Sequence, residues 1–219
     1  MFRKLSMCAL LIAGATVAIV KGESARNFPD PAVKMPASSE QGKQTAVLAG
    51  GCFWGVQGVF ERVKGVTNVV AGYAGGDKST AQYETVSTGR TGHAESVKIT
   101  YDPAKVTFGQ LLKIYFSVVQ DPTELNRQGP DTGTQYRSAI FYMNEDQKRV
   151  AEAYIQQLGN AQVFSRKIVT QVVPYKGFYP AEAYHQHFLD NNPTYPYIVY
   201  NDMPKIAALK KDYPQMCKR

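Results

Sequence analysis

The stretch Thr45-Ala46-Val47-Leu48-Ala49-Gly50-Gly51-Cys52-Phe53-Trp54-Gly55 decides how this chain begins to fold. Its first five residues are mostly apolar and predict a short buried strand, which the two glycines end. Apolar residues then recur at the spacing of one helix face, at Phe53, Val56, Phe60 and Val63. We therefore expect a strand, a glycine turn and a helix, with Cys52 near the first turn of that helix.

The position of Cys52 predicts a reactive thiol. Unpaired N–H groups and the positive end of the helix dipole lie at a helix N-terminus, where they favour the thiolate over the thiol. The thiolate is the nucleophilic form, and the glycines on both sides would let a substrate approach closely. The alternative is a small buried side chain behind a strand–turn–helix corner. The glycines and the aromatic neighbours Phe53 and Trp54 favour the nucleophile.

The N-terminus has the pattern of a secretory signal peptide. Met1-Phe2-Arg3-Lys4 is a basic start, and an apolar run follows over residues 7–20, which is short for a membrane-spanning helix. We expect an exported protein, periplasmic or secreted, with residues 1–22 as the signal. The alternative is an uncleaved N-terminal membrane anchor. Residues 23–43 are rich in proline and serine and poor in apolar residues, so we expect a flexible tether there.

Length and composition indicate one globular domain. The chain has 219 residues, of which 44% are hydrophobic and 20% are charged, enough for one hydrophobic core. We place the domain at residues 44–213 and a C-terminal tail at residues 214–219. The formal net charge of +7 falls to +4 without the signal, because three basic residues and no acidic one leave with it. This weak, scattered charge argues against nucleic acid as a partner.

Two cysteines, Cys52 and Cys217, remain once the signal is removed. In an exported protein such a pair forms either a structural disulfide or a redox pair. A domain of about 170 residues does not need a single disulfide to fold. Cys217 lies in the polar tail Gln215–Arg219, for which we expect mobility. Mobility favours the redox role, and Lys218 and Arg219 would favour the thiolate.

Strand and helix patterns interleave along the rest of the chain. Strands are expected at residues 69–76, 95–101, 138–143 and 168–173, and helices at 107–120, 144–158, 181–189 and 203–211. Thr107 and Gln110 have the spacing of a capping box. Strands that follow one another without a helix near residues 70–101 favour a mixed sheet covered by helices, of the α/β or α+β class.

Glu95 begins an alternating strand on the same face as Val97, Ile99 and Tyr101. On that apolar face the carboxyl group would be desolvated, which raises its pKa and keeps it protonated as a general acid. The alternative is a frayed strand end in water. The loop Gly129–Ser138 is dense in glycine and hydrogen-bonding side chains, so it either lines a site or connects elements in solvent.

The histidines leave a second reaction class open. His93 or His185 would serve as the base for Cys52 in a cysteine hydrolase. His185 and His187 lie two residues apart on an expected helix and point to different faces, which argues against a shared metal ion. We therefore expect no metal site. A third, non-enzymatic reading is a secreted peptide-binding module whose aromatic pocket captures side chains of a peptide.

The chain resembles the A-type peptide methionine sulfoxide reductases over residues 45–200, in the order in which that family shows its motifs. Agreement at so many ordered positions makes chance negligible. The matching segments are Gly51-Cys52-Phe53-Trp54-Gly55, Gly72-Tyr73-Ala74-Gly75-Gly76, Tyr83-Glu84, Gly92-His93-Ala94-Glu95, Tyr101-Asp102-Pro103, Asp121-Pro122-Thr123, Asn126-Arg127-Gln128-Gly129-Pro130-Asp131, Gly133-Thr134-Gln135-Tyr136-Arg137-Ser138, Phe178-Tyr179-Pro180-Ala181-Glu182 and Tyr184-His185-Gln186.

The resemblance implies a thiol-dependent oxidoreductase that repairs oxidative damage. It would reduce methionine-S-sulfoxide, free or in oxidised proteins, to methionine. Cys52 would attack the sulfoxide sulfur, and Glu95 would protonate the sulfoxide oxygen as it leaves. Tyr83 and Tyr136 would donate hydrogen bonds to that oxygen and stabilise the charge that develops on it.

The resemblance also implies substrate contacts and a fold. Phe53 and Trp54 would form the apolar pocket for the S-methyl group of the substrate. Asp131 would support the site through ordered water or the backbone amide of the substrate. The expected fold is α/β (α+β): a mixed β-sheet with packed helices and a ferredoxin-like core, in a single domain.

Recycling would depend on the second cysteine. The sulfenic acid left on Cys52 is expected to condense with Cys217 into a disulfide. An external thiol reductant, a thioredoxin-like protein or dithiothreitol, would then reduce it, and no metal, flavin or nicotinamide cofactor is expected. Some family members carry two recycling cysteines in a glycine-rich C-terminal stretch, whereas this tail has only Cys217. We expect a monomer that meets a membrane only if the N-terminal segment stays uncleaved.

Overall fold

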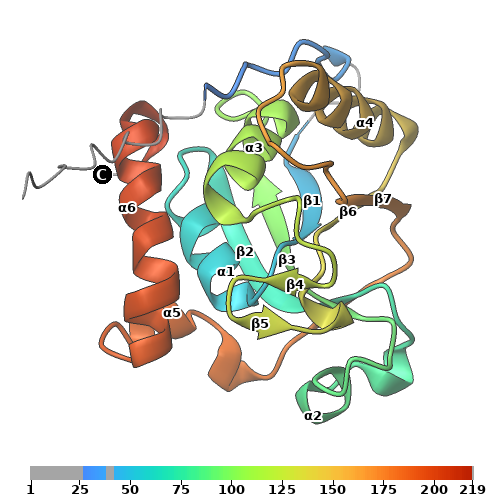
Figure 1. The fold of residues 1–219 in the computed structure, drawn as a ribbon, viewed down its shortest axis with the longest axis vertical. Coiled ribbons are helices and arrows are strands. Elements are labelled where there is room, and N and C mark those ends of the chain that lie inside the picture. Colours follow the sequence, from blue (N-terminus) through green and yellow to red (C-terminus); the bar gives the residue numbers. More distant parts are fainter. Residues whose placement is uncertain (1–26, 38–41, 219) are drawn as a thin grey trace, which may run out of the picture.

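The described chain, residues 27–37 and 42–218 of a computed structural model, is built on one six-stranded sheet (Figure 1). The strands of this sheet are β1 Gln44–Ala49, β2 Val66–Ala74, β3 Ala94–Tyr101, β6 Ala139–Tyr142, β7 Gln171–Pro174 and β8 Phe178–Pro180. They lie in the order β7-β6-β1-β3-β2-β8, with β6 and β7 parallel and the other neighbours antiparallel. A separate ribbon pairs β4 Arg127–Gln128 with β5 Asp131–Thr132.

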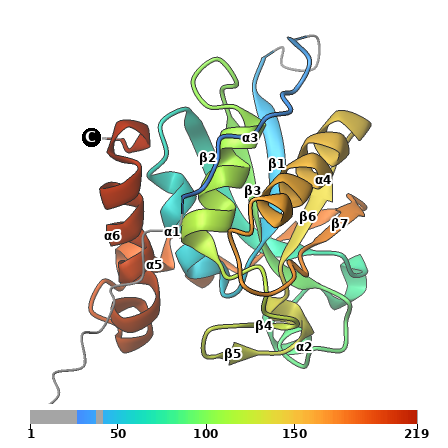
Figure 2. The ribbon, with the colours of Figure 1, turned by 45° about the horizontal axis from the view of Figure 1, so that its top comes forward.

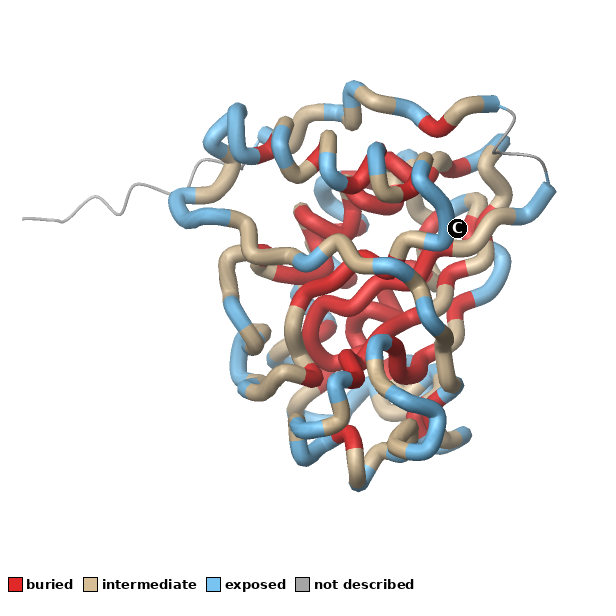
Figure 3. Tube along the Cα trace, turned by 90° about the vertical axis from the view of Figure 1, so that its right-hand side faces the viewer, coloured by how far each residue is buried: buried red, intermediate tan, exposed pale blue. Residues whose placement is uncertain are grey.

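Helices cover one face of the sheet. The helices are α1 Phe53–Glu61, α2 Tyr83–Val86, α3 Phe108–Ile114, α4 Glu145–Asn160, α5 Phe188–Asn191 and α6 Met203–Asp212. The helices α1, α3 and α4 lie on the same side of the sheet (Figure 2). Their apolar faces share one core with Leu48, Val97 and Ile99 of the sheet. Buried chain is concentrated in the sheet and in the helix segments against it (Figure 3). Within the described residues, no helix is long and apolar enough to cross a membrane.

The ferredoxin-like core is confirmed by the connectivity. The order β1-α1-β2-β3-α3-β6 with the antiparallel sheet β6-β1-β3-β2 is the split βαβ arrangement. In this register Leu48 faces Val97 and Ala49 faces Ala139. The end of β1 therefore lies beside the beginnings of both β3 and β6. The turn that carries Cys52, the carboxyl group of Glu95 and the loop before β6 consequently meet at one edge of the sheet.

Local signals placed several elements correctly. The Thr107 hydroxyl accepts the backbone N–H of Gln110 at 3.2 Å, and the Gln110 side chain accepts the N–H of Thr107 at 2.9 Å. This reciprocal capping box begins α3, which continues as a π-helical turn over Tyr115–Val119. Asn144 caps α4 as expected, by accepting the N–H of Gln147.

The prediction of a single helix over residues 181–189 is wrong. The segment instead forms a 3-10 turn at Ala183–His185 and the short α5, and β8 precedes it. Gln186 interrupts the helix because its side chain takes up both polar groups of a β2 residue: it accepts the N–H of Ala71 at 3.0 Å and donates to its carbonyl at 2.9 Å. His187 then adopts a left-handed conformation with φ of 54°. Tertiary hydrogen bonds thus outweigh the local helical pattern.

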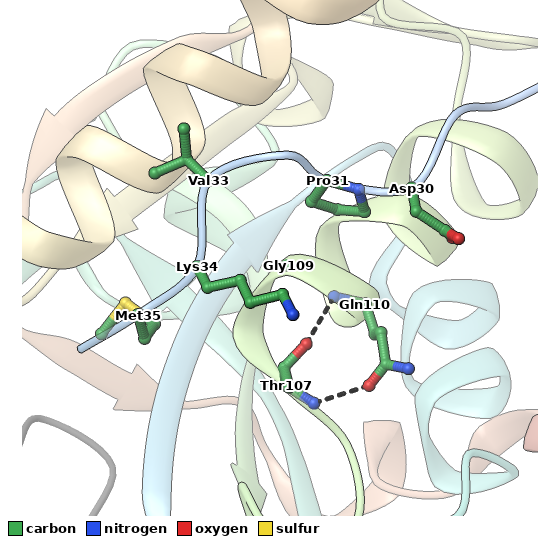
Figure 4. A pocket seen from close by; sticks show the side chains of 8 residues that line it. All are labelled: Asp30, Pro31, Val33, Lys34, Met35, Thr107, Gly109 and Gln110. Atoms are coloured by element: carbon green, nitrogen blue, oxygen red, sulfur yellow. Dashed lines mark hydrogen bonds between the residues drawn. The ribbon is translucent and has the colours of Figure 1, made fainter. Parts of the chain in front are cut away.

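We expected a flexible tether over residues 23–43. This prediction is wrong for residues 27–37, which lie along α3 and α4. Pro29 accepts a hydrogen bond from Tyr154 Oη at 3.0 Å, and Met35 is buried. Asp30 pairs with Lys113 of α3 at 2.7 Å. A pocket lies between this segment and the start of α3, lined by Asp30, Pro31, Val33, Lys34, Met35, Thr107, Gly109 and Gln110 (Figure 4). The residues expected to form the signal peptide lie outside the described part of the chain.

Candidate active site

Cys52 lies where the strand–turn–helix pattern predicted, as the N-cap residue of α1. The turn before it depends on Gly51, whose φ of +88° lies in the left-handed region. A Cβ atom at Gly51 would also lie 2.6 Å from Cγ of Gln128. Glycine is therefore required there both for its conformation and for the close approach of the Gln128 side chain.

A cavity of about 200 Å³ opens over Cys52. It brings Cys52 together with six other residues of the predicted site and two further tyrosines, contributed by α1, α2, β3, β5, the turn before β6 and the segment after α5. The lining residues are Cys52, Phe53, Trp54, Tyr83, Glu95, Asp131, Tyr136, Tyr195 and Tyr197. Every predicted site residue except Cys217 is in this set.

Glu95 is buried on the helix-covered face of β3, with 2% of its surface exposed. Its Oε2 accepts the backbone N–H of Phe53 at 3.0 Å. Burial raises the pKa of Glu95 to about 8; the Phe53 N–H opposes this shift, and the charge of Asp131 adds to it. The carboxyl group is therefore largely protonated at neutral pH. The buried interpretation of Glu95 is correct, and the frayed-end alternative is wrong.

The expected resting thiolate of Cys52 is not supported. Burial raises the pKa of the thiol well above its ordinary value, and the carboxylates of Glu95 and Asp202 raise it further. The backbone N–H of Trp54 lowers it, as a helix N-terminus should, but this effect is the smaller one. Sequence reasoning identified the helix N-terminus correctly and missed the desolvation and the neighbouring acids.

Two tyrosines remain protonated hydrogen-bond donors in the cavity. Burial, followed by the charge of Glu95, raises the pKa of both Tyr83 and Tyr136. Tyr83 is held at the start of α2, because its backbone N–H donates to Glu182 Oε1 at 2.9 Å. Both phenols can therefore donate to an oxygen bound between them and Glu95.

The apolar wall of the cavity comes from an aromatic cluster around the first turn of α1. The Trp54 ring stacks on Phe188 with 3.8 Å between centroids and 12° between planes. Tyr195 and Tyr197 meet the Trp54 ring edge-on. Tyr197 also donates a hydrogen bond from its hydroxyl to Asp131 Oδ2, which holds that carboxylate in the cavity lining.

Tyr195, Tyr197 and Asp202 were missed by the sequence reasoning. The two tyrosines flank Pro196 after a predicted helix end, and no periodicity distinguishes them from an ordinary loop. Asp202 is fully buried and pairs with Lys205 at 3.1 Å. A Cβ atom on Gly55 would lie 2.0 Å from Asp202 Oδ1, so this carboxyl lies against the first turn of α1.

Cys217 is not part of the cavity. It forms a β-bridge with Val63, beyond the C-terminal end of α1. Cys52 lies at the other end, roughly 16 Å along the helix at about 1.5 Å per residue. A disulfide needs the two Cα atoms within about 7 Å, so this conformation keeps the two thiols apart.

The tail that carries Cys217 is held in place, which differs from the mobility we expected. Lys64 N–H donates to the Met216 carbonyl at 2.7 Å, and Lys218 N–H donates to the Arg62 carbonyl at 2.8 Å. The Cys217 thiol donates to the carbonyl of Tyr213 at 3.4 Å. Polar composition suggested a free tail, but its backbone groups find partners at the end of α1.

The histidines do not provide a base for Cys52. His93 Nδ1 accepts the Gly76 N–H at 3.2 Å, and its Nε2 lies 3.0 Å from the Asp77 carbonyl. His185 Nδ1 accepts from the Trp54 indole. The geometry therefore gives no support to the hydrolase reading. Among residues 27–37 and 42–218, no group of three or more His, Cys, Asp or Glu side chains could hold a metal ion.

Comparison with known proteins gives one consistent result. Residues 44–216 match the family model of peptide methionine sulfoxide reductase. The chain is 62% identical to the peptide methionine sulfoxide reductase MsrA 2 of Mesorhizobium japonicum, over 83% of this chain and 93% of that protein. It is 52% identical to the MsrA 2 of Synechocystis, over 87% of this chain and 90% of that protein.

Solved structures agree with the sequence relatives. The reduced form of Mxr1 from Saccharomyces cerevisiae superposes with a TM-score of 0.65 at 31% identity, covering 77% of this chain and 94% of that one. Methionine sulfoxide reductase A of Corynebacterium diphtheriae gives a TM-score of 0.60 at 34% identity, over 76% and 83% of the two chains. The chain belongs to the peptide methionine sulfoxide reductase family.

Proposed function

We propose that Cys52 is the nucleophile with which this oxidoreductase reduces methionine-S-sulfoxide, free or in oxidised proteins. Family membership gives the reaction class, reduction of methionine sulfoxide. The assignment to Cys52 is supported by one observation above all: a buried thiol shares a small cavity with a protonated carboxyl group and two phenol donors. A nucleophile, a proton donor and hydrogen bonds for a developing oxyanion are what sulfoxide reduction needs.

In the proposed reaction the Cys52 sulfur attacks the sulfoxide sulfur while the oxygen leaves. Glu95 gives its proton to that oxygen, and Tyr83 and Tyr136 donate hydrogen bonds to it. The hydroxide or water released in this step then attacks the Cys52 sulfur, and the new bond between the two sulfur atoms breaks with its electron pair returning to the substrate. Cys52 is left as a sulfenic acid and the substrate leaves as methionine, so the thiol is oxidised and the sulfoxide is reduced. The charge of Glu95 opposes the Cys52 thiolate, so a protonated Glu95 also eases formation of the nucleophile.

The substrate would lie with its S-methyl group against Phe53 and Trp54 at the apolar end of the cavity. Asp131, held by Tyr197 at the rim, would contact the backbone amide of the substrate directly or through water. The S configuration is proposed from the resemblance to the A-type reductases, and the cavity geometry is not the basis for it. No metal, flavin or nicotinamide takes part in these steps.

Recycling needs a thiol, and Cys217 is the internal candidate. The sulfenic acid would condense with Cys217 to release water and form a disulfide, which a thioredoxin-like protein or dithiothreitol would reduce by exchange. Because Cys217 lies at the far end of α1, the tail would first have to leave Arg62 and Lys64. Direct reduction of the sulfenic acid by the external thiol is the alternative.

One assay separates the candidate functions. The full chain is incubated with methionine sulfoxide and dithiothreitol, and the products are identified. Formation of methionine supports the reductase, cleavage of an ester or amide substrate would support a hydrolase, and binding without turnover would support a peptide-binding module. Use of separate S and R epimers tests the stereochemical proposal.

We propose an exported, monomeric repair enzyme, periplasmic or secreted. The support is the basic start and apolar run of residues 1–22, which lie outside the described residues. N-terminal sequencing of the exported product decides whether the segment is a cleaved signal or a retained anchor. A protein that begins at Met1 and stays with the membrane would contradict the secreted form and support the membrane-anchored alternative.

A further inference from the structure

The indole of Trp54 is held by a polar contact that the proposed reaction does not use. Its Nε1–H donates to Nδ1 of His185 at 3.2 Å. His185 is buried, with 2% of its surface exposed. Because Nδ1 accepts this hydrogen bond, the neutral ring must carry its proton on Nε2. Within residues 27–37 and 42–218, Nε2 is buried without a hydrogen-bond partner.

The His185 ring lies directly behind the cavity wall. Its centroid is 5.1 Å from that of Phe53, 5.8 Å from Trp54 and 4.5 Å from Tyr83. All three of those residues line the cavity, whereas His185 does not. It therefore contacts the residues that meet the substrate and has no direct contact with the space that the substrate would fill.

The surroundings of His185 favour its neutral form. Burial lowers the pKa of the imidazole, and the charge of Glu182 opposes that shift. The Glu182 carboxylate is engaged elsewhere, since it accepts from Tyr73 Oη at 2.8 Å and from the backbone of Tyr83. The other groups around the ring are the uncharged phenols of Tyr83 and Tyr184 and the aromatic rings of α1.

We propose that neutral His185 is a positioning residue, which fixes the Trp54 indole by accepting its N–H and thereby shapes the pocket for the S-methyl group. The proposal rests on the proposed function, because it assigns the Trp54 wall to substrate binding. Protonation would turn Nδ1 from an acceptor into a donor that faces the indole donor. The hydrogen bond would then be lost and the ring would no longer be held.

This mechanism gives the pocket an acid-sensitive component. The folded protein keeps His185 neutral, whereas the unfolded chain takes up its proton near the ordinary value of about 6.5. The contribution of His185 to pocket geometry and to stability is therefore present above that value and is lost as pH falls through the lowered pKa. KM should rise on the acid side, and the effect is distinct from that of Glu95, which acts on the alkaline side.

Two substitutions separate the acceptor from the bulk of the ring. His185→Phe keeps an aromatic ring without an acceptor, and His185→Asn places an amide near the position of Nδ1 without the ring. We expect His185→Phe to raise KM about fivefold, the effect of about one lost hydrogen bond, with little change in kcat. His185→Asn should restore most of the affinity. An Asn variant as impaired as the Phe variant would overturn the acceptor role.

His187→Asn is the matched control. His187 lies two residues away and pairs with Glu61 at 2.7 Å, and asparagine tolerates its left-handed conformation. Its KM should match that of the unmodified protein. A control variant with the same rise in KM as His185→Phe would show that the effect is not specific to the Trp54 contact.

A spectroscopic test does not depend on activity. Trp54 is the single tryptophan of the chain, so the ¹⁵N-labelled protein has one indole N–H resonance. We expect a coupling across the hydrogen bond between the indole nitrogen and one imidazole nitrogen, and its loss in His185→Phe. Absence of this coupling in the unmodified protein, or an unchanged KM in His185→Phe, would overturn the proposal. If His185→Phe fails to fold, the coupling in the unmodified protein still tests the proposal. Its measurement does not require the protein to reduce sulfoxide.

Discussion

The two ends of α1 place two cysteines in opposite surroundings. At the N-terminal end, Cys52 lies in an aromatic cavity beside a protonated carboxyl group. At the C-terminal end, Cys217 lies in a β-bridge with Val63, and its thiol donates to backbone carbonyls. Both residues are cysteines near an end of the same helix, so residue type alone does not distinguish them.

The comparison teaches that neighbouring groups decide what a thiol can do. The helix N-terminus does lower the pKa of Cys52, but burial and the nearby acids outweigh it. Reactivity then depends on a partner that supplies a proton to the leaving oxygen, which Glu95 can do. The carbonyl groups around Cys217 only accept hydrogen bonds, so none of them can supply a proton to a leaving oxygen. The N-terminal end of α1 surrounds its thiol with groups that can support the proposed reaction, whereas the C-terminal end holds the tail.

The largest expected difference between the two ends is in the first turnover. Cys52→Ser should abolish reduction, because a hydroxyl group is a far weaker nucleophile at this position and cannot form a sulfenic acid. Cys217→Ser should complete one turnover at a near-normal rate. Rapid quenching without reductant, with methionine counted per protein molecule, measures both. Appreciable reduction by Cys52→Ser would contradict the mechanism.

Removal of the proton donor should have the next largest effect. Glu95→Gln should lower kcat/KM by about two orders of magnitude, the usual scale of general acid catalysis. In the unmodified protein the rate should fall as pH rises through about 8, where Glu95 loses its proton. That alkaline decline should be absent in Glu95→Gln. A variant with the same pH–rate profile as the unmodified protein would remove Glu95 from this role.

The same group links stability to pH. The pKa of Glu95 is raised in the folded protein, so its contribution to stability is fully present below the unfolded value, near 4.3, and is lost as pH rises through about 8. Glu95→Gln should therefore flatten the dependence of the free energy of unfolding on pH in this window. Urea denaturation at several pH values measures it, and an equal slope in both proteins would contradict the buried, protonated state.

A smaller difference should appear in recycling. Cys217→Ser should turn over poorly with a thioredoxin-like reductant, and a small thiol should largely restore the rate by reducing the sulfenic acid directly. Because disulfide formation requires the tail to leave α1, the amides of Lys64 and Lys218 should exchange faster after one equivalent of sulfoxide. Peptide mapping then provides the direct test. If no Cys52–Cys217 disulfide is found, recycling must proceed by direct reduction of the Cys52 sulfenic acid by the external thiol.

The surroundings of Cys52, at the N-terminal end of α1, were predicted better from the sequence than those of Cys217, at the C-terminal end. Several core elements follow from patterns that are local: alternating apolar residues, a capping box at Thr107 and a glycine turn before Cys52. The ferredoxin-like topology was implied by the family resemblance. The alternation of its strand placed Glu95 on the apolar face, although spacing alone left a frayed strand end in water equally open. These signals are determined by neighbours in the chain, so one sequence is enough to read them.

The remaining features depend on partners far away in the chain. Gln186 ends a predicted helix because of hydrogen bonds to Ala71, and Tyr197 joins the site through Asp131. The raised pKa of Cys52 comes partly from Asp202, which no spacing relates to it. The tail likewise is held by the carbonyl of Arg62. Such contacts leave no periodic pattern in the sequence.

The smallest expected effect tests whether the tail acts as a clamp. Lys218→Pro removes the backbone donor to Arg62, whereas Lys218→Ala keeps it; both lose the side-chain contact to the Glu61 carbonyl. The proline variant should lose about 1 kcal/mol and roughly 2–4 °C in Tm, and the alanine variant at most about 0.5 kcal/mol. If tail release precedes recycling, the proline variant should also form the Cys52–Cys217 disulfide faster, although it is the less stable protein. Loss of stability without faster disulfide formation would separate the clamp from recycling and leave the C-terminal end of α1 with a purely structural role.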